Sequence, residues 1–204
     1  MYICLILFLS LAASLPAATL IPAANFGAPT VVTFSSSGNF TSPAAYTEAG
    51  ASFRETASGE TIYTYSGILD PDLIGGGSAS LDVIFPSLMD RFGFIANPSV
   101  FTSRNFNIAS VTFYSDTAMT SVTESYTTVF SVTSSDTFFG LEQGAGSFAA
   151  VRLLLTPQGS SGFSPTIDDF RFEATGVPEP ASFGLLGLGA GCLVLAWRRR
   201  ASTR

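Results

Sequence analysis

The sequence contains no histidine and no lysine, and its two cysteines lie close to its two ends. Cys4 and Cys192 each stand in an apolar terminal segment, so residues 19–173 between those segments hold no thiol and no imidazole. This absence excludes Ser-His-Asp and Cys-His catalysis from the middle of the chain. It also removes the usual ligands of transition-metal sites, and it means that the middle must fold without a disulfide bond.

Positive charge is scarce as well. The 204 residues carry a formal net charge of −6, and four of the nine basic residues lie after residue 197. Once Glu179 is set aside, the middle keeps five arginines against fourteen acidic residues, which leaves it at −9. A surface of this charge repels phosphate backbones, so we expect no nucleic-acid partner.

An apolar run extends from Ile3 to Ala13, and only Ser10 interrupts it. It is too short for a bilayer span and suits the core of a secretory signal peptide. Small residues follow, and cleavage after Ser14 or after Ala18 fits them. No basic residue precedes the run, and a buried N-terminal strand or helix is the alternative. We predict a helical signal peptide over residues 1–18 and export through the Sec machinery.

The middle, residues 19–173, shows short runs in which β-branched and aromatic residues alternate with polar ones. Clusters of Ser, Asn, Gly and Pro separate these runs, and no stretch keeps a helical period. We therefore predict a mainly β domain, an antiparallel two-sheet sandwich of the jelly-roll kind. The predicted strands are 30–34, 61–65, 80–85, 91–95, 108–114, 125–132, 148–155 and 167–172. The predicted turns are 35–39, 70–72, 75–77, 96–98, 144–146 and 158–162.

Nineteen phenylalanines are many for a chain of this length. Each ring buries a large apolar area when it packs in a core, and a sandwich without disulfides needs such packing. The same rings stack on sugars when they stand in a row on an exposed sheet face. We favour the core role and keep sugar stacking as the alternative.

The chain changes character after Glu173. Residues 174–180 form a linker that contains Pro178, Glu179 and Pro180, and the two prolines hold it extended. Residues 181–197 are uncharged and glycine-rich. At about 1.5 Å per residue, a helix of this length just crosses a bilayer core. We predict one transmembrane helix there, with the sandwich outside the inner membrane.

A basic end, residues 198–204, follows the apolar span and begins with Arg198, Arg199 and Arg200. By the positive-inside rule, this end stays in the cytoplasm. The order of a Pro-Glu-Pro motif, a glycine-rich span and an arginine cluster resembles the PEP-CTERM sorting signal of Gram-negative bacteria. The resemblance implies recognition by an exosortase, a membrane protease, then removal of the tail and release or attachment at the surface, in a setting of exopolysaccharide. A permanent single-span anchor is the alternative.

A second resemblance concerns the middle of the chain. Phe138-Phe139-Gly140, a buried run at 149–155 and the segment 167–172 follow one another as they do in sandwich domains that precede such tails. Those domains are similar to lectins and to carbohydrate-binding jelly rolls. The resemblance implies a lectin-like β-sandwich.

Four aspartates are candidate site residues: Asp70 and Asp72, which flank a proline, and Asp168 and Asp169 in the last predicted strand. Calcium takes about six to eight oxygen ligands, largely from carboxylates and carbonyls, so these residues are candidate Ca²⁺ ligands. Neighbouring side chains on a strand point to opposite faces, so Asp168 and Asp169 cannot both enter one site by their side chains alone. At a local bulge, one of the two could cap a turn or meet Arg171. We favour turn capping or an ion pair with Arg171, and we expect no other cofactor.

Three functions remain open for the exported domain. We favour a non-catalytic surface or extracellular-matrix protein, held first at the inner membrane and then sorted to the cell surface or the medium. A carbohydrate-binding module that contacts extracellular polysaccharide, with or without calcium, is the first alternative, and a row of exposed aromatic rings would favour it. An exported glycoside hydrolase is the second, and a cleft with two carboxylates would favour it.

Overall fold

The computed structural model describes residues 17–57, 59–72, 77–97, 105–133, 136–144, 146–158 and 165–174. These residues form β-strands and one short 3₁₀ helix, η1, at Ala23–Asn25. The strands are β1 Thr19–Leu20, β2 Thr30–Val32, β3 Gly38–Thr41, β4 Tyr46–Glu48, β5 Ala51–Glu55, β6 Thr61–Tyr65, β7 Ile68–Asp72, β8 Ala79–Met89, β9 Arg91–Asn97, β10 Phe106–Tyr114, β11 Val122–Val132, β12 Thr137–Glu142, β13 Phe148–Pro157 and β14 Thr166–Glu173.

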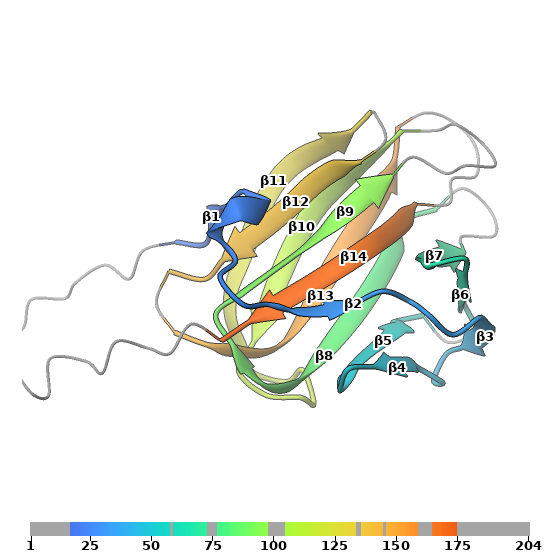
Figure 1. Cartoon of the computed structure of the whole chain (residues 1–204), viewed down its shortest axis with the longest axis horizontal. Helices are drawn as coiled ribbons and strands as arrows, with labels where there is room; N and C mark the ends of the chain where they lie inside the picture. Colours follow the sequence, from blue (N-terminus) through green and yellow to red (C-terminus); the bar gives the residue numbers. More distant parts are fainter. Residues whose placement is uncertain are drawn as a thin grey trace, which may run out of the picture. The chain divides into compact units, whose positions relative to one another are not determined.

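The strands form two antiparallel sheets that face each other as a sandwich (Figure 1). The eight-stranded sheet has the order β1-β12-β9-β14-β7-β6-β3, and β2 also pairs with β14. The six-stranded sheet has the order β11-β10-β13-β8-β5-β4. The prediction of a mainly β protein built from two antiparallel sheets is confirmed.

The strands predicted from alternation are all present, as β2, β6, β8, β9, β10, β11, β13 and β14. The other strands are short or mixed in composition, and the alternation pattern does not predict β1, β3, β4, β5, β7 or β12. Two predicted turns, 35–39 and 96–98, extend into β3 and β9. A strand that is short or only partly apolar becomes stable through its neighbours, and a single sequence does not show those neighbours.

The predicted turn at 70–72 is wrong, because these residues end strand β7. Proline cannot donate a ladder hydrogen bond, so an Asp-Pro-Asp sequence favours a turn or a sheet edge. In this structure β7 pairs with β6 along its whole length, but it pairs with β14 only between Leu69 and Ile167. Pro71 therefore lies in a strand that is largely open on one side, and strands tolerate proline in that setting.

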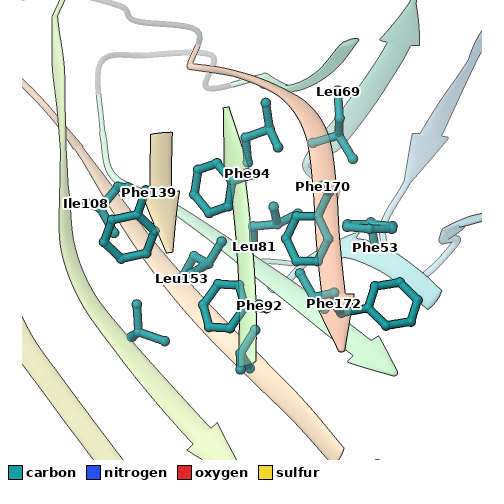
Figure 2. Packing of buried hydrophobic residues seen from close by; sticks show 14 of the residues in the cluster. Phe53, Leu69, Leu81, Phe92, Phe94, Ile108, Phe139, Leu153, Phe170 and Phe172 are labelled. Atoms are coloured by element: carbon teal, nitrogen blue, oxygen red, sulfur yellow. The ribbon is translucent and has the colours of Figure 1, made fainter. Parts of the chain in front are cut away.

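Phenylalanines from both sheets fill the space between them (Figure 2). Phe94 and Phe170 of one sheet stack with ring centroids 5.8 Å apart, and Phe170 meets Phe53 of the other sheet edge-on at 5.1 Å. Phe92 likewise meets Phe148 across the core at 6.0 Å. Most of the phenylalanines that the structure describes are buried, and the rest are half-buried. The predicted core role is confirmed for the buried rings.

Two glycines bring β9 and β12 together beneath an aromatic ring. Gly93 and Gly140 lie directly opposite each other. A Cβ atom on Gly93 would stand 2.6 Å from the Phe138 ring and 2.8 Å from a backbone carbonyl oxygen. Phe26 meets the Phe138 ring edge-on at 6.0 Å, and the Arg171 guanidinium lies 5.8 Å from its centroid. The ring therefore fills the space that side chains at these two positions would otherwise need.

The chain divides into two units, Met1–Glu173 and Ala174–Arg204. Almost all of the predicted signal peptide and tail, residues 1–16 and 175–204, falls outside the described residues. Within the described residues, no helix is long and apolar enough to cross a membrane. The helices expected at 1–18 and 181–197 therefore stay predictions.

Candidate functional site

A polar pocket with a volume of about 400 Å³ lies beside β5 and β8. We call it the Glu55 pocket. It is lined by Ser42, Pro43, Arg54, Glu55, Thr56, Asp82 and Arg152. Its volume falls within the range of about 300–1,000 Å³ that small-molecule sites occupy.

The pocket lies beside the part of β5 that is no longer paired with β4. The edge strand β4 pairs with β5 only from Ala51 to Phe53, so its pairing stops before Arg54 and Glu55. Ser42 and Pro43, which precede β4, border the pocket instead. On its other side β5 stays paired with β8 as far as Glu55, which holds the pocket wall in register. The paired strand therefore positions these charged side chains, of which Arg54 is partly exposed whereas Glu55 and Asp82 are buried.

Asp82 anchors a row of charges across three neighbouring strands. It lies directly opposite Arg54 of β5 on one side and directly opposite Arg152 of β13 on the other. Arg152 donates from Nε to Oδ1 at 2.7 Å and from Nη2 to Oδ2 at 3.1 Å. Thr56 adds a hydrogen bond to Oδ1 at 3.0 Å. Asp82 is only 1% exposed, and these donors compensate the cost of burying its charge.

The two arginines differ in how firmly they are held. Arg152 makes the paired hydrogen bonds to Asp82, which raise its pKa, and its guanidinium also lies 5.8 Å from the Tyr114 ring centroid. Arg54 reaches Asp82 only at 3.6 Å, which is longer than a hydrogen bond, and its side chain is 36% exposed. The guanidinium of Arg54 therefore keeps donors that a bound molecule could use.

Glu55 also lines the pocket, but it occupies an inward position of β5. The residue is 1% exposed, and its Oε1 atom has no hydrogen-bond partner. Burial raises the pKa of Glu55 to about 7, and repulsion from Glu60 and Asp82 adds to this effect. The backbone amides of Ser80 and Thr56 act in the opposite direction. A buried polar atom without a partner is unusual in a native protein.

Two acidic residues, Glu55 and Asp82, are among those that line the pocket. Their environments differ, because burial favours the neutral form of Glu55 whereas two arginines surround Asp82. Such an asymmetric pair is what glycoside hydrolysis uses. Both oxygens of Asp82 already accept hydrogen bonds from Arg152, however, so neither is free to act as nucleophile or base without breaking that pair.

The sequence pattern does not single out these four charged residues. One signal was available in residues 51–55, where Ala51 and Phe53 face the core and Glu55 occupies the next inward position. A carboxyl group in an inward position of a strand is costly unless it has a purpose or a partner. That Glu55 lines the same pocket as Asp82 and Arg152 depends on the order of the strands in the sheet. The alternation of apolar and polar residues does not predict that order.

Asp168 and Asp169 lie at a bulge in β14. The register with β9 shifts between Asp168 and Arg171, and Asp169 has a φ of 45°. The backbone N–H of Asp169 donates to Asp168 at 2.6 Å, and Arg171 contacts Asp169 at 3.3 Å. Burial raises the pKa of Asp168. Asp169 and Arg171 therefore form an ion pair, and turn capping by these aspartates stays a prediction.

Asp70 lies on β7, next to β14, and accepts a hydrogen bond from the Tyr65 hydroxyl at 2.9 Å. The side chain of Asp72 lies outside the described part of the structure. Among the residues that are described, no group of three or more acidic, histidine or cysteine side chains gathers in a way that could hold a metal ion. Calcium binding by these aspartates stays a prediction.

Exposed aromatic rings are missing from the described surface. None of the described tyrosines or phenylalanines is classed as exposed. The large exposed apolar side chains in this part of the chain are aliphatic: Leu20, Val31, Leu88 and Val122. The row of rings that would favour sugar stacking is therefore not present among the described residues.

Comparison with known proteins bears first on the C-terminal segment. Residues 176–200 match the family model described as the PEP-CTERM protein-sorting motif. The chain carries a PEP-CTERM sorting motif. The match confirms the resemblance based on Pro178, Glu179 and Pro180 and on the arginines Arg198 to Arg200, all of which lie outside the described residues.

Neither of the other comparisons assigns a role to the sandwich that precedes the PEP-CTERM motif. A search among curated proteins finds no match to the chain. Among solved structures, a family 29 carbohydrate-binding module from Piromyces equi matches with 10% sequence identity and a TM-score of 0.45. The match covers 72% of this chain and 91% of the module. A likeness this weak does not bear on what this chain binds.

Proposed function

We propose that the protein is an exported surface or extracellular-matrix protein whose tail is a signal for exosortase processing. The observation that carries this proposal is the PEP-CTERM motif at residues 176–200. The last strand, β14, ends at Glu173, so no described strand includes any part of the motif. Cleavage within the motif would therefore leave every described strand intact.

In this proposal, the two terminal segments direct the export and the membrane anchoring of the protein. Residues 1–18 act as a signal peptide for the Sec machinery, and residues 174–180 link the sandwich to a transmembrane helix at 181–197. The basic end, residues 198–204, keeps the tail on the cytoplasmic side of the inner membrane. The protein passes through this anchored intermediate before it reaches the cell surface or the medium.

We further propose that the sandwich is not catalytic. The chain has no histidine, and both oxygens of the buried Asp82 are engaged by Arg152. A carboxylate held in this way supports a structural or binding role better than it supports nucleophilic attack.

Intact-mass analysis of protein from the medium and from membranes tests the sorting proposal. We expect the secreted form to lack the tail from within or just before the Pro-Glu-Pro motif, and we expect the full tail in a strain without the exosortase. Glu179→Ala should also retain the tail, because it alters the motif. Glu60→Ala, which changes an acidic residue between β5 and β6, is the matched control and should be processed normally. A full tail in every fraction of the wild type would show a permanent anchor instead.

Carbohydrate binding by the sandwich is the second candidate function, and the Glu55 pocket favours it. The support does not come from an aromatic row, because no described ring is exposed. It comes from a concave site lined by charged and hydroxyl side chains, in which Arg54 is 36% exposed and reaches Asp82 only at 3.6 Å. Converging donors and acceptors in a pocket are what hydroxyl-rich ligands require.

A further inference from the structure

The segment around β1 connects the edges of the two sheets. Ala18, the residue before β1, is 4% exposed and belongs to the hydrophobic core. Its backbone N–H donates to the Glu124 carboxylate of β11, which is the end strand of the six-stranded sheet. The next two residues, Thr19 and Leu20, pair with β12 of the eight-stranded sheet (Figure 1). Ala18 therefore contributes to the closure of the sandwich between β11 and β12.

The residues after β1 stay attached to the eight-stranded sheet. The backbone N–H of Ile21 donates to the carbonyl oxygen of Gly140 at 3.0 Å, and the Ile21 side chain is buried. Further along, β2 pairs with β14. The change from solvent to core comes between two neighbouring alanines, because Ala17 is exposed whereas Ala18 is buried. Ala18 is therefore the first residue of the described chain that is buried in the fold.

Two positions were left open for removal of the signal peptide, after Ser14 and after Ala18. Ser14 lies outside the described residues, whereas Ala18 lies within them. A cut after Ala18 would remove a side chain from the core and the N–H that donates to Glu124. The half-buried Glu124 carboxylate would thereby lose a charge-assisted hydrogen bond. A cut after Ser14 keeps both contacts.

The local sequence favours the same position for an independent reason. A signal-peptide cleavage site has a small residue just before the cut and another small residue two positions earlier. For a cut after Ser14, these positions hold Ser14 and Ala12, and both are small. For a cut after Ala18, the earlier position holds Pro16. The burial of Ala18 and the local pattern therefore agree on the upstream site.

We propose that signal peptidase, the membrane protease that removes signal peptides, cuts this chain after Ser14, so that Ala18 stays in the mature domain as a core residue. The reaction is hydrolysis of the Ser14–Leu15 peptide bond, in which water supplies the hydroxyl of the new carboxyl group and the hydrogen of the new amine. This inference rests on the signal peptide proposed above and shortens it from residues 1–18 to residues 1–14.

N-terminal sequencing of the protein from membranes and from the medium tests the proposal. We expect the mature chain to begin at Leu15. A chain that begins at Thr19 would overturn this inference and leave the proposed signal peptide in place. A chain that begins at Met1 in both fractions would overturn the signal peptide and the inference together. A start at any other residue would overturn the assignment of the cut to Ser14.

Two matched substitutions separate the candidate sites. Ser14→Leu places a bulky residue just before the proposed cut, so we expect this variant to lose processing and to accumulate as the precursor. Ala18→Leu makes the same change at the other site and should be processed normally. The reverse pair of results would place the cut after Ala18 and overturn the proposal. Pulse labelling measures processing before any misfolded chain is degraded, so the result does not depend on how well Ala18→Leu folds.

The thermal midpoint of the mature protein supplies a second readout. Ala18→Glu buries a carboxylate in the core, so we expect the midpoint to fall by at least about 5 °C. Ala17→Glu, at the exposed neighbouring position, is the control and should stay within about 1 °C of the wild type. A failure of Ala18→Glu to fold while Ala17→Glu folds would support the proposal equally. Equal midpoints would mean that Ala18 is absent from the mature core, which would overturn it.

Discussion

The burial of single acidic residues in this protein costs free energy, which the surrounding fold must offset. Glu55 stands at an inward position of β5, 1% exposed, with one oxygen unpartnered. Asp82, equally buried, has donors from Arg152 and Thr56. Burial favours the protonated form of Glu55 and raises its pKa to about 7.

The first prediction concerns the stability contributed by Glu55. Its pKa is raised to about 7 in the folded state, so the proton bound there stabilises the fold fully below the unfolded value of about 4.3, and that stabilisation is lost as the pH rises to 7. Relative to Glu55→Gln, the wild type should lose on the order of 3 kcal/mol of unfolding free energy between pH 4 and pH 8. Urea denaturation of both proteins across this range measures the difference. Parallel stability curves would contradict the buried, proton-binding environment of Glu55.

The pairing of strands depends on how closely their backbones approach each other, as well as on the alternation of apolar and polar residues. The β9–β12 pair places Gly93 opposite Gly140 and covers both with the Phe138 ring. Glycine in a strand interior normally weakens the strand, and here the ring restores the missing packing. The Phe138 ring therefore covers these two glycines on the sheet surface, which accounts for a large ring outside the core.

The second prediction follows from this close approach. Gly93→Ala places a Cβ atom 2.8 Å from a backbone carbonyl oxygen and 2.6 Å from the Phe138 ring, so either the strands or the ring must shift. We expect the free energy of unfolding to fall by about 1–3 kcal/mol. Gly77→Ala is the control, because a Cβ at that position meets nothing within 4 Å, and its effect should stay within about 0.5 kcal/mol. Equal stability of the two variants in urea would mean that β9 and β12 are not packed as described.

The whole molecule holds its two sheets together without covalent help. The chain's cysteines, Cys4 and Cys192, both lie outside residues 19–173. The core is instead filled by a network of phenylalanine rings that joins the sheets, including the stacked pair Phe94 and Phe170. Aromatic pairs add about 0.5–1.5 kcal/mol beyond their area burial, which suits an exported domain that lacks disulfides.

The third prediction tests this independence from disulfides. A reducing agent should change the thermal midpoint of the sandwich by less than about 1 °C, because no thiol or disulfide lies within it. Differential scanning calorimetry with and without dithiothreitol measures the effect. The variant Cys4→Ser/Cys192→Ser should behave in the same way. A clear drop in the midpoint on reduction would show that a disulfide formed by Cys4 or Cys192 contributes to the stability of the fold.

Much of the fold follows from the local alternation of apolar and polar residues. The strands that this pattern fails to predict have local causes. Alternation identifies the long strands because one face of each is buried. It misses β5, where Arg54 and Glu55 end a short run, and β7, where Pro71 imitates a turn. Both strands exist because paired neighbours supply hydrogen bonds that their own residues do not specify.

The amino-acid sequence by itself determined the β class of the middle and the sorting address of the C-terminal segment. Both depend only on residues that are close together in the chain. The β class follows from an alternation of period 2, and the sorting address follows from a Pro-Glu-Pro motif, an apolar span and Arg198 to Arg200. Only the tertiary structure decided the Glu55 pocket. Arg54, Asp82 and Arg152 are far apart in the chain and meet because β5, β8 and β13 are adjacent in one sheet, and that adjacency depends on long-range pairing.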